Sequence, residues 1–299
     1  MKTLEAGKRI ALSNILFATD FSPHSDVALP YALAIAHQYG AKLYGAHIAS
    51  AQDYLFTAPD LWPAHQDEEQ QLRHEVVDRL DKQLSGVPHE ALFGVGDVWN
   101  ALSQLIGKHA IDLLVVGTHG RTGTRKLLMG SVAEKIFRRA TCPVLTIGPS
   151  VPSRADGKVQ FERILFATSF GEESLAALPY ALSLAEEDRA DLTILHVVEQ
   201  PAAGVLNLAE VKASIRHRLE QLVPPESASR CHVDCVVEFG HQFARPAERI
   251  VDIGRERDVD LIVLGVCPSH GAMRTATHLA NTGQHVVAHA TCPVLTVRG

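Results

Sequence analysis

The sequence has no surplus of basic residues, because 28 lysines and arginines stand against 34 aspartates and glutamates, for a formal charge of −6. Proteins that bind DNA or RNA broadly need such a surplus to neutralise phosphates, so this class is excluded. The sequence also has no run of 18 apolar residues, and its first residues lack the apolar segment and cleavage site of a secretory signal. We therefore expect a cytoplasmic protein without nucleic-acid or membrane partners.

Cysteine is scarce, with five residues in 299. Cys142 and Cys292 occupy the same place in two copies of ATCPVLT, just before an apolar run, and are expected to be small buried hydrophobes. Cys231 and Cys235 lie four residues apart in a segment of strand character, which separates them by roughly 13 Å, too far for a disulfide. A disulfide framework is therefore excluded.

The sequence contains an internal duplication. ILFATDFSPHSDVALPYALAIAHQYGAKLYGAHI from Ile15 aligns without gaps with ILFATSFGEESLAALPYALSLAEEDRADLTILHV from Ile164, and about half of the positions are identical. The pairs IDLLVVG and VDLIVLG, and ATCPVLTIG and ATCPVLTVR, match in the same way. A stretch with the Pro, Ser and Gly of a linker lies at 149–160. We therefore predict two domains of one fold, residues 1–150 and 151–299.

Each copy alternates short apolar runs with longer segments of helical period. In the first copy this pattern predicts strands at 15–19, 42–48, 90–94, 113–117 and 144–147. Ser22 followed by Pro23 predicts a helix start, since Ser caps free N–H groups and Pro fits the first turn. Pro30 and its counterpart Pro179 predict a kink or an interrupted helix. Buried strands joined by helical crossovers indicate an α/β protein with a doubly wound, five-stranded parallel sheet in each copy.

The stretch LLVVGTHGRTGTRKLLMGSVAEKIFRRATCPVLTIG has the features of a polyphosphate site. Gly117 and Gly120 let the backbone turn tightly and approach a ligand without a Cβ clash. Gly130 and Ser131 are expected to place unpaired N–H groups and a hydroxyl at a helix N-terminus, where the dipole favours anions. Three cations lie in the connecting loop: Arg121, Arg125 and Lys126. They either contact phosphates or form a solvated loop face.

The spacing Gly, two residues, Gly, nine residues, Gly-Ser resembles the nucleotide-binding signature of the ATP-binding universal stress proteins. ATDFS at the end of the first strand and the terminal TCPVLTI strand extend this resemblance over nearly the whole chain, as two tandem copies. The resemblance implies strand order 3-2-1-4-5 in each copy, a Rossmann-like arrangement similar to that of the adenine nucleotide alpha hydrolases. ATP, with or without Mg²⁺, would lie across the carboxyl ends of strands one and four, where open α/β sheets generally bind ligands.

The resemblance also implies roles for residues of the first copy. Asp20 would contact the adenosine portion, and the backbone near His47 and Ile48 would flank adenine. Ribose and phosphates would be held by Gly117, Gly120, Gly130 and Ser131, with Arg121 in the same loop. Simpler roles stay open: a turn or helix cap for Asp20, and a core histidine for His47, whose counterpart His196 ends the same strand. The glycine spacing also suits an ordinary loop and helix cap.

The second copy departs from the signature. Gly265 matches Gly117, but the interval from Gly265 to TCPV is two residues longer than in the first copy. Counting back from TCPV places Ala280-Asn281 where Gly130-Ser131 stand, and Ser169 replaces Asp20. Micromolar affinity needs about 8 kcal/mol, and each lost charge-assisted hydrogen bond removes about 1.5–3 kcal/mol. We predict that the first copy binds nucleotide and that the second does not.

The second copy is rich in histidine near Cys267. The histidines concerned are His270, His278, His285 and His289. His285 and His289 are four apart in a predicted helix, a spacing that can present two imidazoles to one metal. Lys135 and Arg139 occupy the same positions in the first copy, which favours an exposed basic face, and no metal site is predicted.

These features favour a stress protein that senses or stores adenine nucleotide and passes its loaded state to an unidentified protein partner. One alternative is a slow ATPase or phosphotransferase that uses the same pocket. Hydrolysis needs a positioned water and usually a base. His119 is the one candidate base in the loop. Another alternative is an interaction module without nucleotide. The P-loop motif G-x-x-x-x-G-K-[ST] is absent from the sequence.

The duplication also bears on assembly. Members of the resembled family usually pair two domains through their last strands, so the resemblance implies a pseudo-dimer within one chain. Pro143 and Pro293 begin those strands, a position that proline tolerates. Whether two chains associate further as a homodimer stays open.

Overall fold

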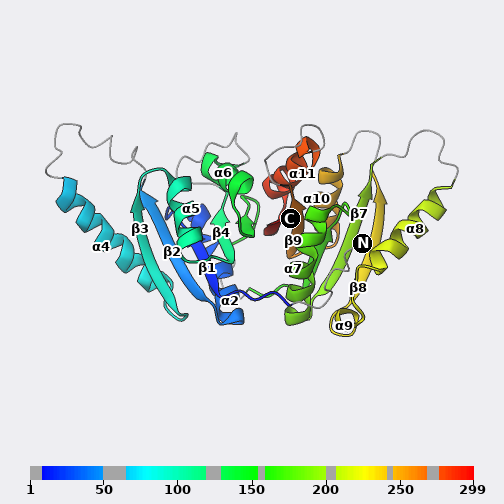
Figure 1. Cartoon of the computed structure of the whole chain (residues 1–299), viewed down its shortest axis with the longest axis horizontal. Coiled ribbons are helices and arrows are strands. Elements are labelled where there is room, and N and C mark those ends of the chain that lie inside the picture. The colour runs from blue at the N-terminus through cyan, green and yellow to red at the C-terminus, as the bar shows by residue number, and fades with distance from the viewer. Residues whose placement is uncertain are drawn as a thin grey trace. The chain divides into compact units, whose positions relative to one another are not determined.

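The chain folds into two units, and each is described here by itself. The computed structural model describes residues 9–49, 65–118, 129–153, 159–199, 207–240, 245–267 and 276–299. The N-terminal unit consists mainly of Ala11–Pro149, and the C-terminal unit mainly of Gln160–Gly299. Figure 1 labels most of the helices and strands of both. Within the described ranges, none of the helices combines the length and hydropathy that crossing a membrane requires.

The N-terminal unit is built on a parallel sheet with the order β3-β2-β1-β4-β5. Its strands are β1 (Asn14–Ala18), β2 (Lys42–Ala49), β3 (His89–Val95), β4 (Leu113–Gly117) and β5 (Val144–Ile147). Its helices are α1 (Pro23–Asp26), α2 (Leu29–Tyr39), α4 (His65–Gln83), α5 (Val98–Lys108) and α6 (Ser131–Arg139). The strands lie within about one residue of the bounds that the apolar runs predict.

The C-terminal unit repeats this order as β8-β7-β6-β9-β10, again with parallel neighbours. Its strands are β6 (Arg163–Ala167), β7 (Asp191–Val198), β8 (Val233–Phe239), β9 (Leu261–Val266) and β10 (Val294–Arg298). Its helices are α7 (Glu172–Asp188), α8 (Leu208–Glu220), α9 (Pro225–Ala228), α10 (Pro246–Glu256) and α11 (Ala276–His289). The α/β class and the strand order 3-2-1-4-5 in each unit are thereby confirmed.

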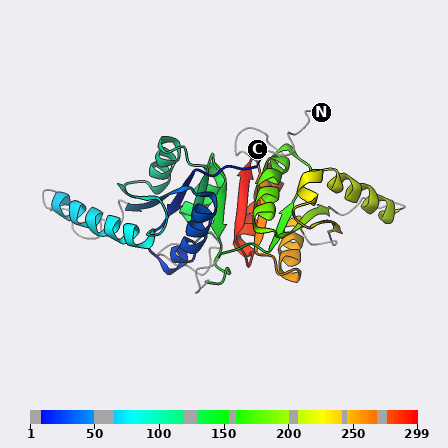
Figure 2. The same ribbon diagram turned by 90° about the horizontal axis from the view of Figure 1, so that it is seen from below.

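The central strands form the core of each unit. In β1 the side chains of Ile15, Leu16 and Phe17 are at most 1% exposed, and the equivalent residues of β6 are fully buried. Because successive side chains of a strand point to opposite faces, burial of all of them requires helices on both faces of the sheet. Figure 2 shows this arrangement in the N-terminal unit, with α5 on one side and α2 and α4 on the other.

Four of the five cysteines are buried in this interior, and Cys267 is half-buried. All five are free thiols, and Cys142 and Cys292 are buried as predicted. Burial raises the pKa of Cys142 to about 11 and that of Cys292 to about 12, because an apolar surrounding disfavours the thiolate. Both side chains therefore remain protonated at neutral pH and act as small hydrophobes.

The first helix of the N-terminal unit begins as the sequence predicts, and the two units differ in how their first helix continues. Ser22 caps α1, where its Oγ accepts the N–H of Ser25 at 3.2 Å, and Pro23 is the first helical residue. α1 ends at Asp26, and α2 then starts with Pro30 in its first turn. In the C-terminal unit α7 runs without interruption through Pro179. The N-terminal unit therefore has two short helices where the C-terminal unit has one long helix.

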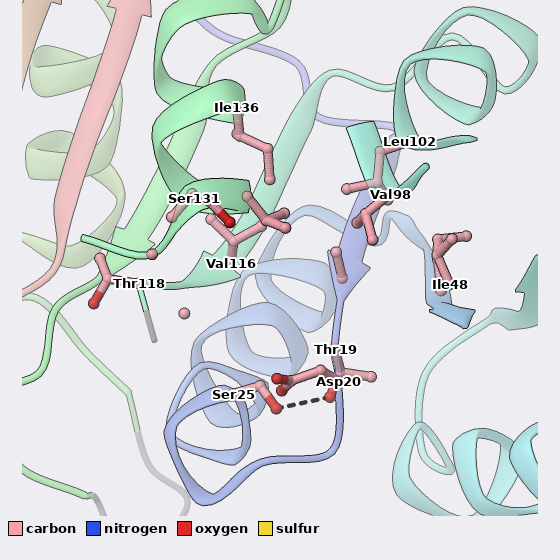
Figure 3. Close-up of a pocket in the computed structure, with 16 residues that line it drawn as sticks. Thr19, Asp20, Ser25, Ile48, Val98, Leu102, Val116, Thr118, Ser131 and Ile136 are labelled. Carbon is pink, nitrogen blue, oxygen red and sulfur yellow. Dashed lines mark hydrogen bonds between the residues drawn. The ribbon is translucent and has the colours of Figure 1, made fainter. Parts of the chain in front are cut away.

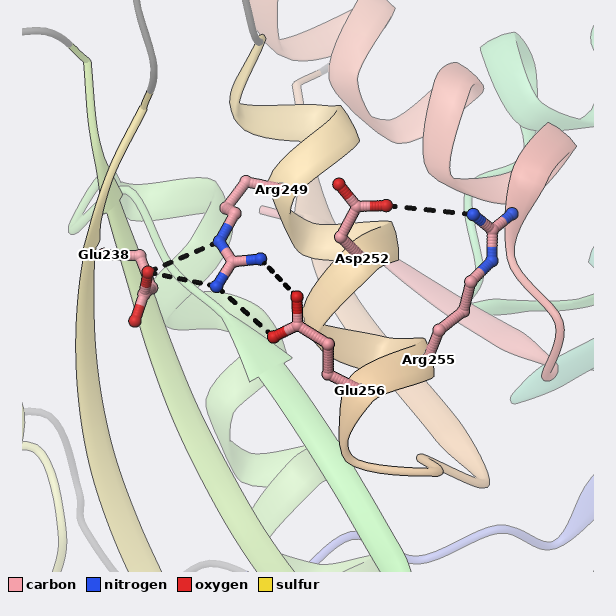
Figure 4. A network of polar contacts seen from close by, with 5 residues as sticks. All are labelled: Glu238, Arg249, Asp252, Arg255 and Glu256. Atoms are coloured by element: carbon pink, nitrogen blue, oxygen red, sulfur yellow. Dashed lines mark hydrogen bonds and ion pairs between the residues drawn. The ribbon is translucent and has the colours of Figure 1, made fainter.

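A charged network fixes α10 to the edge of the C-terminal sheet. Arg249 donates from Nη2 to Glu238 on β8 at 3.2 Å and from Nη1 to Glu256 on α10 at 2.7 Å (Figure 4). The Arg249 side chain is only 20% exposed, and hydrogen bonds to Glu256 and Glu238 raise its pKa. This network is specific to the C-terminal unit, because β3 and α5 carry Gly94 and Ala101 at the positions of Glu238 and Arg249.

Replacing Arg249 with alanine is expected to lower the thermal midpoint by about 3 °C, because it breaks the contact of α10 with Glu238 on β8 and removes the partner of Glu256. The matched control is Arg216→Ala, since Arg216 makes an exposed pair with Glu220 on its own helix at 3.3 Å. Such exposed pairs contribute little, so this control should move the midpoint by less than about 1 °C. Scanning calorimetry of the full chain measures both. Equal shifts for the two variants would contradict a role of the network in holding α10.

Candidate functional site

The candidate site is a cavity at the carboxyl ends of β1 and β4 in the N-terminal unit. Strand order reverses at this point of a doubly wound sheet, and the flanking loops diverge and leave a crevice. The cavity has a volume of about 180 Å³. Its described lining residues are Ala18, Thr19, Asp20, Ser25, Ala46, Ile48, Val98, Leu102, Val116, Gly117, Thr118, Gly130, Ser131, Val132, Ala133 and Ile136.

The chain after β1 is held in a tight polar turn that presents Asp20. Thr19 Oγ1 lies 2.9 Å from Ser25 Oγ and also accepts the N–H of Phe21 at 2.9 Å. Asp20 Oδ1 accepts the N–H of Ser22 at 3.0 Å. Phe21 takes a positive φ of 59°, which a phenylalanine rarely adopts, so these bonds hold a strained turn. The Asp20 carboxylate therefore has a fixed place on the cavity wall.

His47 contacts the turn after β1 through a hydrogen bond to Thr19 and a ring contact with Phe21. Its side chain is 4% exposed, its Nδ1–H donates to Thr19 O at 2.8 Å, and its ring stacks on Phe21 with 4.8 Å between centroids. His47 is not among the residues that line the cavity, whereas its neighbour Ile48 is. This placement matches a core histidine that positions the β1 turn.

β4 and α6 form the opposite wall. A Cβ on Gly117 would lie 2.9 Å from His24 O, so only glycine lets α1 pack this closely over the end of β4. Gly130 precedes α6 with an ordinary negative φ of −67°, and its N–H donates to Thr118 O at 2.9 Å. The expectation that the N–H of Gly130 is unpaired is therefore wrong. The groups of this wall that are chemically suited to an anion are instead in the first turn of α6, which starts at Ser131.

The N-terminus of α6 can bind an anion for a geometric reason. The first N–H groups of any α-helix have no carbonyl acceptor within the helix, and they carry the positive end of the helix dipole. In α6 these groups belong to Ser131, Val132 and Ala133, which all line the cavity. The Ser131 hydroxyl adds a side-chain donor at the same place.

The remaining predicted residues fall in the connecting loop. Gly120 and Arg121 lie outside the described residues, as do His119, Arg125 and Lys126. Five of the eight predicted nucleotide contacts line one cavity: Asp20, Ile48, Gly117, Gly130 and Ser131.

The cavity has an apolar part and a polar part. Figure 3 shows Ile48, Val98 and Leu102 gathered apart from Thr19, Asp20 and Ser25. At about 180 Å³ the cavity exceeds the roughly 150 Å³ that accommodates benzene in an engineered apolar site. The cavity as a whole is thus large enough for a flat heteroaromatic ring. Its apolar part offers a surface on which such a ring can pack, and its polar part offers a carboxylate, hydroxyls and a helix N-terminus.

Sequence reasoning missed the apolar wall that α5 supplies. Val98 and Leu102 are four residues apart on α5 and therefore share one helix face. α5 is tied to α6 by Lys135 Nζ, which lies 3.2 Å from Asp97 Oδ2. Asp97 also caps α5 by accepting the N–H of Asn100, and this bond, together with Lys135, lowers the pKa of its carboxyl group. The i, i+4 spacing of Val98 and Leu102 was the signal that could have found this wall.

The C-terminal unit preserves the turn after the first strand. Thr168 Oγ1 lies 2.9 Å from Ser174 Oγ, Phe170 N–H donates to Thr168 Oγ1 at 3.0 Å, and Phe170 has a positive φ of 62°. His196 donates from Nδ1 to Thr168 O at 2.7 Å, as His47 does to Thr19. The scaffold of the site is therefore duplicated, although Ser169 stands in place of Asp20.

The histidines of the C-terminal unit do not form a metal centre within the described residues. His270 and the side chain of His278 lie outside that part of the chain. The rings of His285 and His289 stack with 4.0 Å between centroids, and His289 Nδ1–H donates to His285 O at 2.8 Å. Among the described residues no three His, Cys, Asp or Glu side chains are grouped as metal ligands.

Comparison with known proteins agrees with this architecture. A family model described as the universal stress protein family matches residues 12–148 and again residues 160–298. The chain belongs to the universal stress protein family. Its two matched segments correspond to the two duplicated units.

Individual universal stress proteins resemble one unit or both. Universal stress protein A homolog 1 of Coxiella burnetii is 34% identical over 137 residues, which is 45% of this chain and 94% of that protein. A universal stress protein of Methanocaldococcus jannaschii is 29% identical over 136 residues, which is 44% of this chain and 80% of that protein. The crystal structure of a universal stress protein from Archaeoglobus fulgidus matches at a TM-score of 0.72 and 21% identity, covering 95% of this chain and 98% of that one. The last comparison shows a shared fold over both units.

Proposed function

We propose that the N-terminal unit binds ATP and that the chain acts as a stress-response sensor or regulator whose nucleotide state is read by a protein partner. The observation that supports this most strongly is the juxtaposition of Asp20 and the Ser131 end of α6 across one cavity with an apolar inner part. An adenine nucleotide has the same division, with an apolar heteroaromatic ring, a sugar with hydroxyls and an anionic chain.

Each part of ATP has a chemically suitable partner in this proposal. Adenine would pack against Ile48, Val98 and Leu102. The Asp20 carboxylate would accept hydrogen bonds from the adenosine portion, and the N–H groups and hydroxyl at the start of α6 would donate to phosphate oxygens. Gly120 and Arg121 are proposed to complete the phosphate site from the loop after β4.

Mg²⁺ fits this proposal as a companion of the phosphates. The ion usually keeps several waters and is held by phosphate oxygens with one or two carboxylates. Asp20 is the one carboxylate among the described residues that line the cavity. The site therefore suits an ion that arrives with ATP better than an ion held by the protein alone.

Isothermal titration of the full chain tests the proposal. We expect one ATP per chain, since the C-terminal unit has Ser169 for Asp20 and Asn281 for Ser131. Chromatography of the nucleotide released by heating freshly purified protein identifies what the site carries. Two equivalent ATP sites per chain would contradict the assignment to the N-terminal unit. The absence of any ATP binding would favour an interaction module, and turnover with Mg²⁺ would favour an enzyme.

A further inference from the structure

The C-terminal unit has its own cavity at the carboxyl ends of β6 and β9. Its volume is about 310 Å³, larger than the cavity of the N-terminal unit and within the range of small-molecule sites, roughly 300–1,000 Å³. Its described lining residues are Ala167, Thr168, Ser169, Ser174, Leu195, His196, Val197, Val198, Glu199, Pro246, Ile250, Leu264, Gly265, Thr282 and Gly283. The loss of the phosphate signature has therefore not filled the crevice.

The helix that faces this cavity has changed its start. In the N-terminal unit α6 begins at Ser131, whereas α11 begins at Ala276, five residues before Asn281, which occupies the position of Ser131. Asn281, Thr282 and Gly283 consequently lie inside a helix, where N–H groups bond to carbonyls four residues earlier. At the position of Ser131, α11 therefore offers no unpaired N–H groups of a helix start.

The described lining residues of this cavity include one charged side chain, and its charge is negative. Glu199 follows β7 directly and is an exposed residue at the cavity rim, and none of the described lining residues is a lysine or arginine. Burial lowers the pKa of His196, which keeps its ring neutral at pH 7. Because Nδ1–H donates to Thr168 O, Nε2 of the neutral ring is a hydrogen-bond acceptor.

The rest of the lining suits an uncharged ligand with a ring and hydroxyl groups. Val197, Val198 and Ile250 supply an apolar wall, and Ser169 and Ser174 supply hydroxyls. α10, which carries Pro246 and Ile250 into this wall, is held by the Arg249 network shown in Figure 4. A carboxylate at the carboxyl end of a strand is also the group that accepts hydrogen bonds from ribose hydroxyls in dinucleotide-binding sheets.

We propose that this cavity binds an uncharged nucleoside, with its base against the apolar wall and its sugar hydroxyls donating to Glu199. The site discriminates against phosphate, because α11 does not begin at the position of Ser131 and Glu199 adds a negative charge at the rim. The chain thus holds two unlike sites, one for a nucleotide and one for a nucleoside. The inference concerns a different unit from the proposed ATP site and does not depend on it.

Titration with adenosine as the probe tests this inference on the full chain. With ATP at saturating concentration, we expect one adenosine per chain, and we expect AMP to bind the same site at least tenfold more weakly. The location is tested by a matched pair of substitutions, because Thr282 and Val132 occupy the same helix position and each lines its own cavity. Thr282→Phe should abolish adenosine binding and keep ATP binding, and Val132→Phe should do the reverse.

Charge reversal at the rim tests the discrimination itself. Glu199 is exposed, so Glu199→Lys should fold normally and should raise the affinity for AMP above that for adenosine. The inference is overturned if adenosine does not bind, if only Val132→Phe removes its binding, or if AMP and adenosine bind equally in a manner that Thr282→Phe abolishes. If the unsubstituted chain binds adenosine but not ATP, the proposed ATP site is refuted and this inference stands.

Discussion

The substitution Ser131→Asp is expected to weaken ATP binding by at least a hundredfold without weakening the fold. An aspartate in the first turn of α6 places a carboxylate where the proposed site holds phosphate. Two like charges about 4 Å apart repel by roughly 4 kcal/mol at an effective dielectric constant near 20, and each 1.4 kcal/mol is a factor of ten. The same carboxylate interacts favourably with the helix dipole, so the free energy of unfolding should stay equal or rise slightly.

Two further variants separate charge from position. Ser131→Ala removes one donor and should weaken ATP binding about tenfold, since a hydrogen bond to a charged group contributes about 1.5–3 kcal/mol. Asn281→Asp is the matched control in the C-terminal unit, and it should leave ATP affinity unchanged. Titration calorimetry gives the affinities, and urea unfolding gives the stabilities. Unchanged ATP affinity in Ser131→Asp would place the phosphates away from α6.

Much of the fold was predictable because it follows from short-range patterns. Apolar runs located the strands of the N-terminal sheet, and the repeat from Ile15 and Ile164 identified two units with one topology. The Ser22-Pro23 helix start followed from capping chemistry alone and is present in the structure. These features depend on residues that are close in sequence, so one sequence suffices to find them.

The effect of the two aligned prolines could not be predicted. Pro30 and Pro179 each remove one backbone donor, so both predict a kink or an interruption. The structure interrupts the helix only before Pro30, between α1 and α2, and carries α7 through Pro179. The proline itself is common to both units, so the difference depends on packing that the pattern does not contain.

The site was predicted in outline and missed in two respects. Asp20 and Ser131 line one cavity, as the resemblance implies, but the N–H of Gly130 is already paired with Thr118 O. The earlier start of α11 was also missed, although a signal for it exists. Ala280 replaces Gly130, and alanine is more stable in a helix than glycine by about 1 kcal/mol. The C-terminal helix can therefore begin before the position at which α6 begins in the N-terminal unit.

The substitution Gly265→Ala is expected to lower the free energy of unfolding of the C-terminal unit by about 3 kcal/mol, at the upper end of the usual cost of overpacking. A Cβ at Gly265 would overlap with the backbone carbonyl group of Glu173 and with Ser174 Cα. Both residues belong to α7, which is one continuous helix of 17 residues packed on β9. A short segment of α7 cannot shift away from β9 by itself, so the strain spreads over the whole contact between α7 and β9.

Gly117→Ala is the matched control, because the same Cβ in the N-terminal unit would lie 2.9 Å from His24 O. His24 belongs to α1, a helix of four residues separated from α2, so a small local shift relieves the contact. We therefore expect a loss of only about 1 kcal/mol there. Hydrogen exchange resolved by peptide distinguishes the two units in the full chain. Equal losses would mean that the interruption between α1 and α2 gives the N-terminal unit no greater freedom to adjust.

A larger loss in Gly265→Ala should also displace Ser174 from Thr168, and with it the polar wall of the proposed nucleoside site.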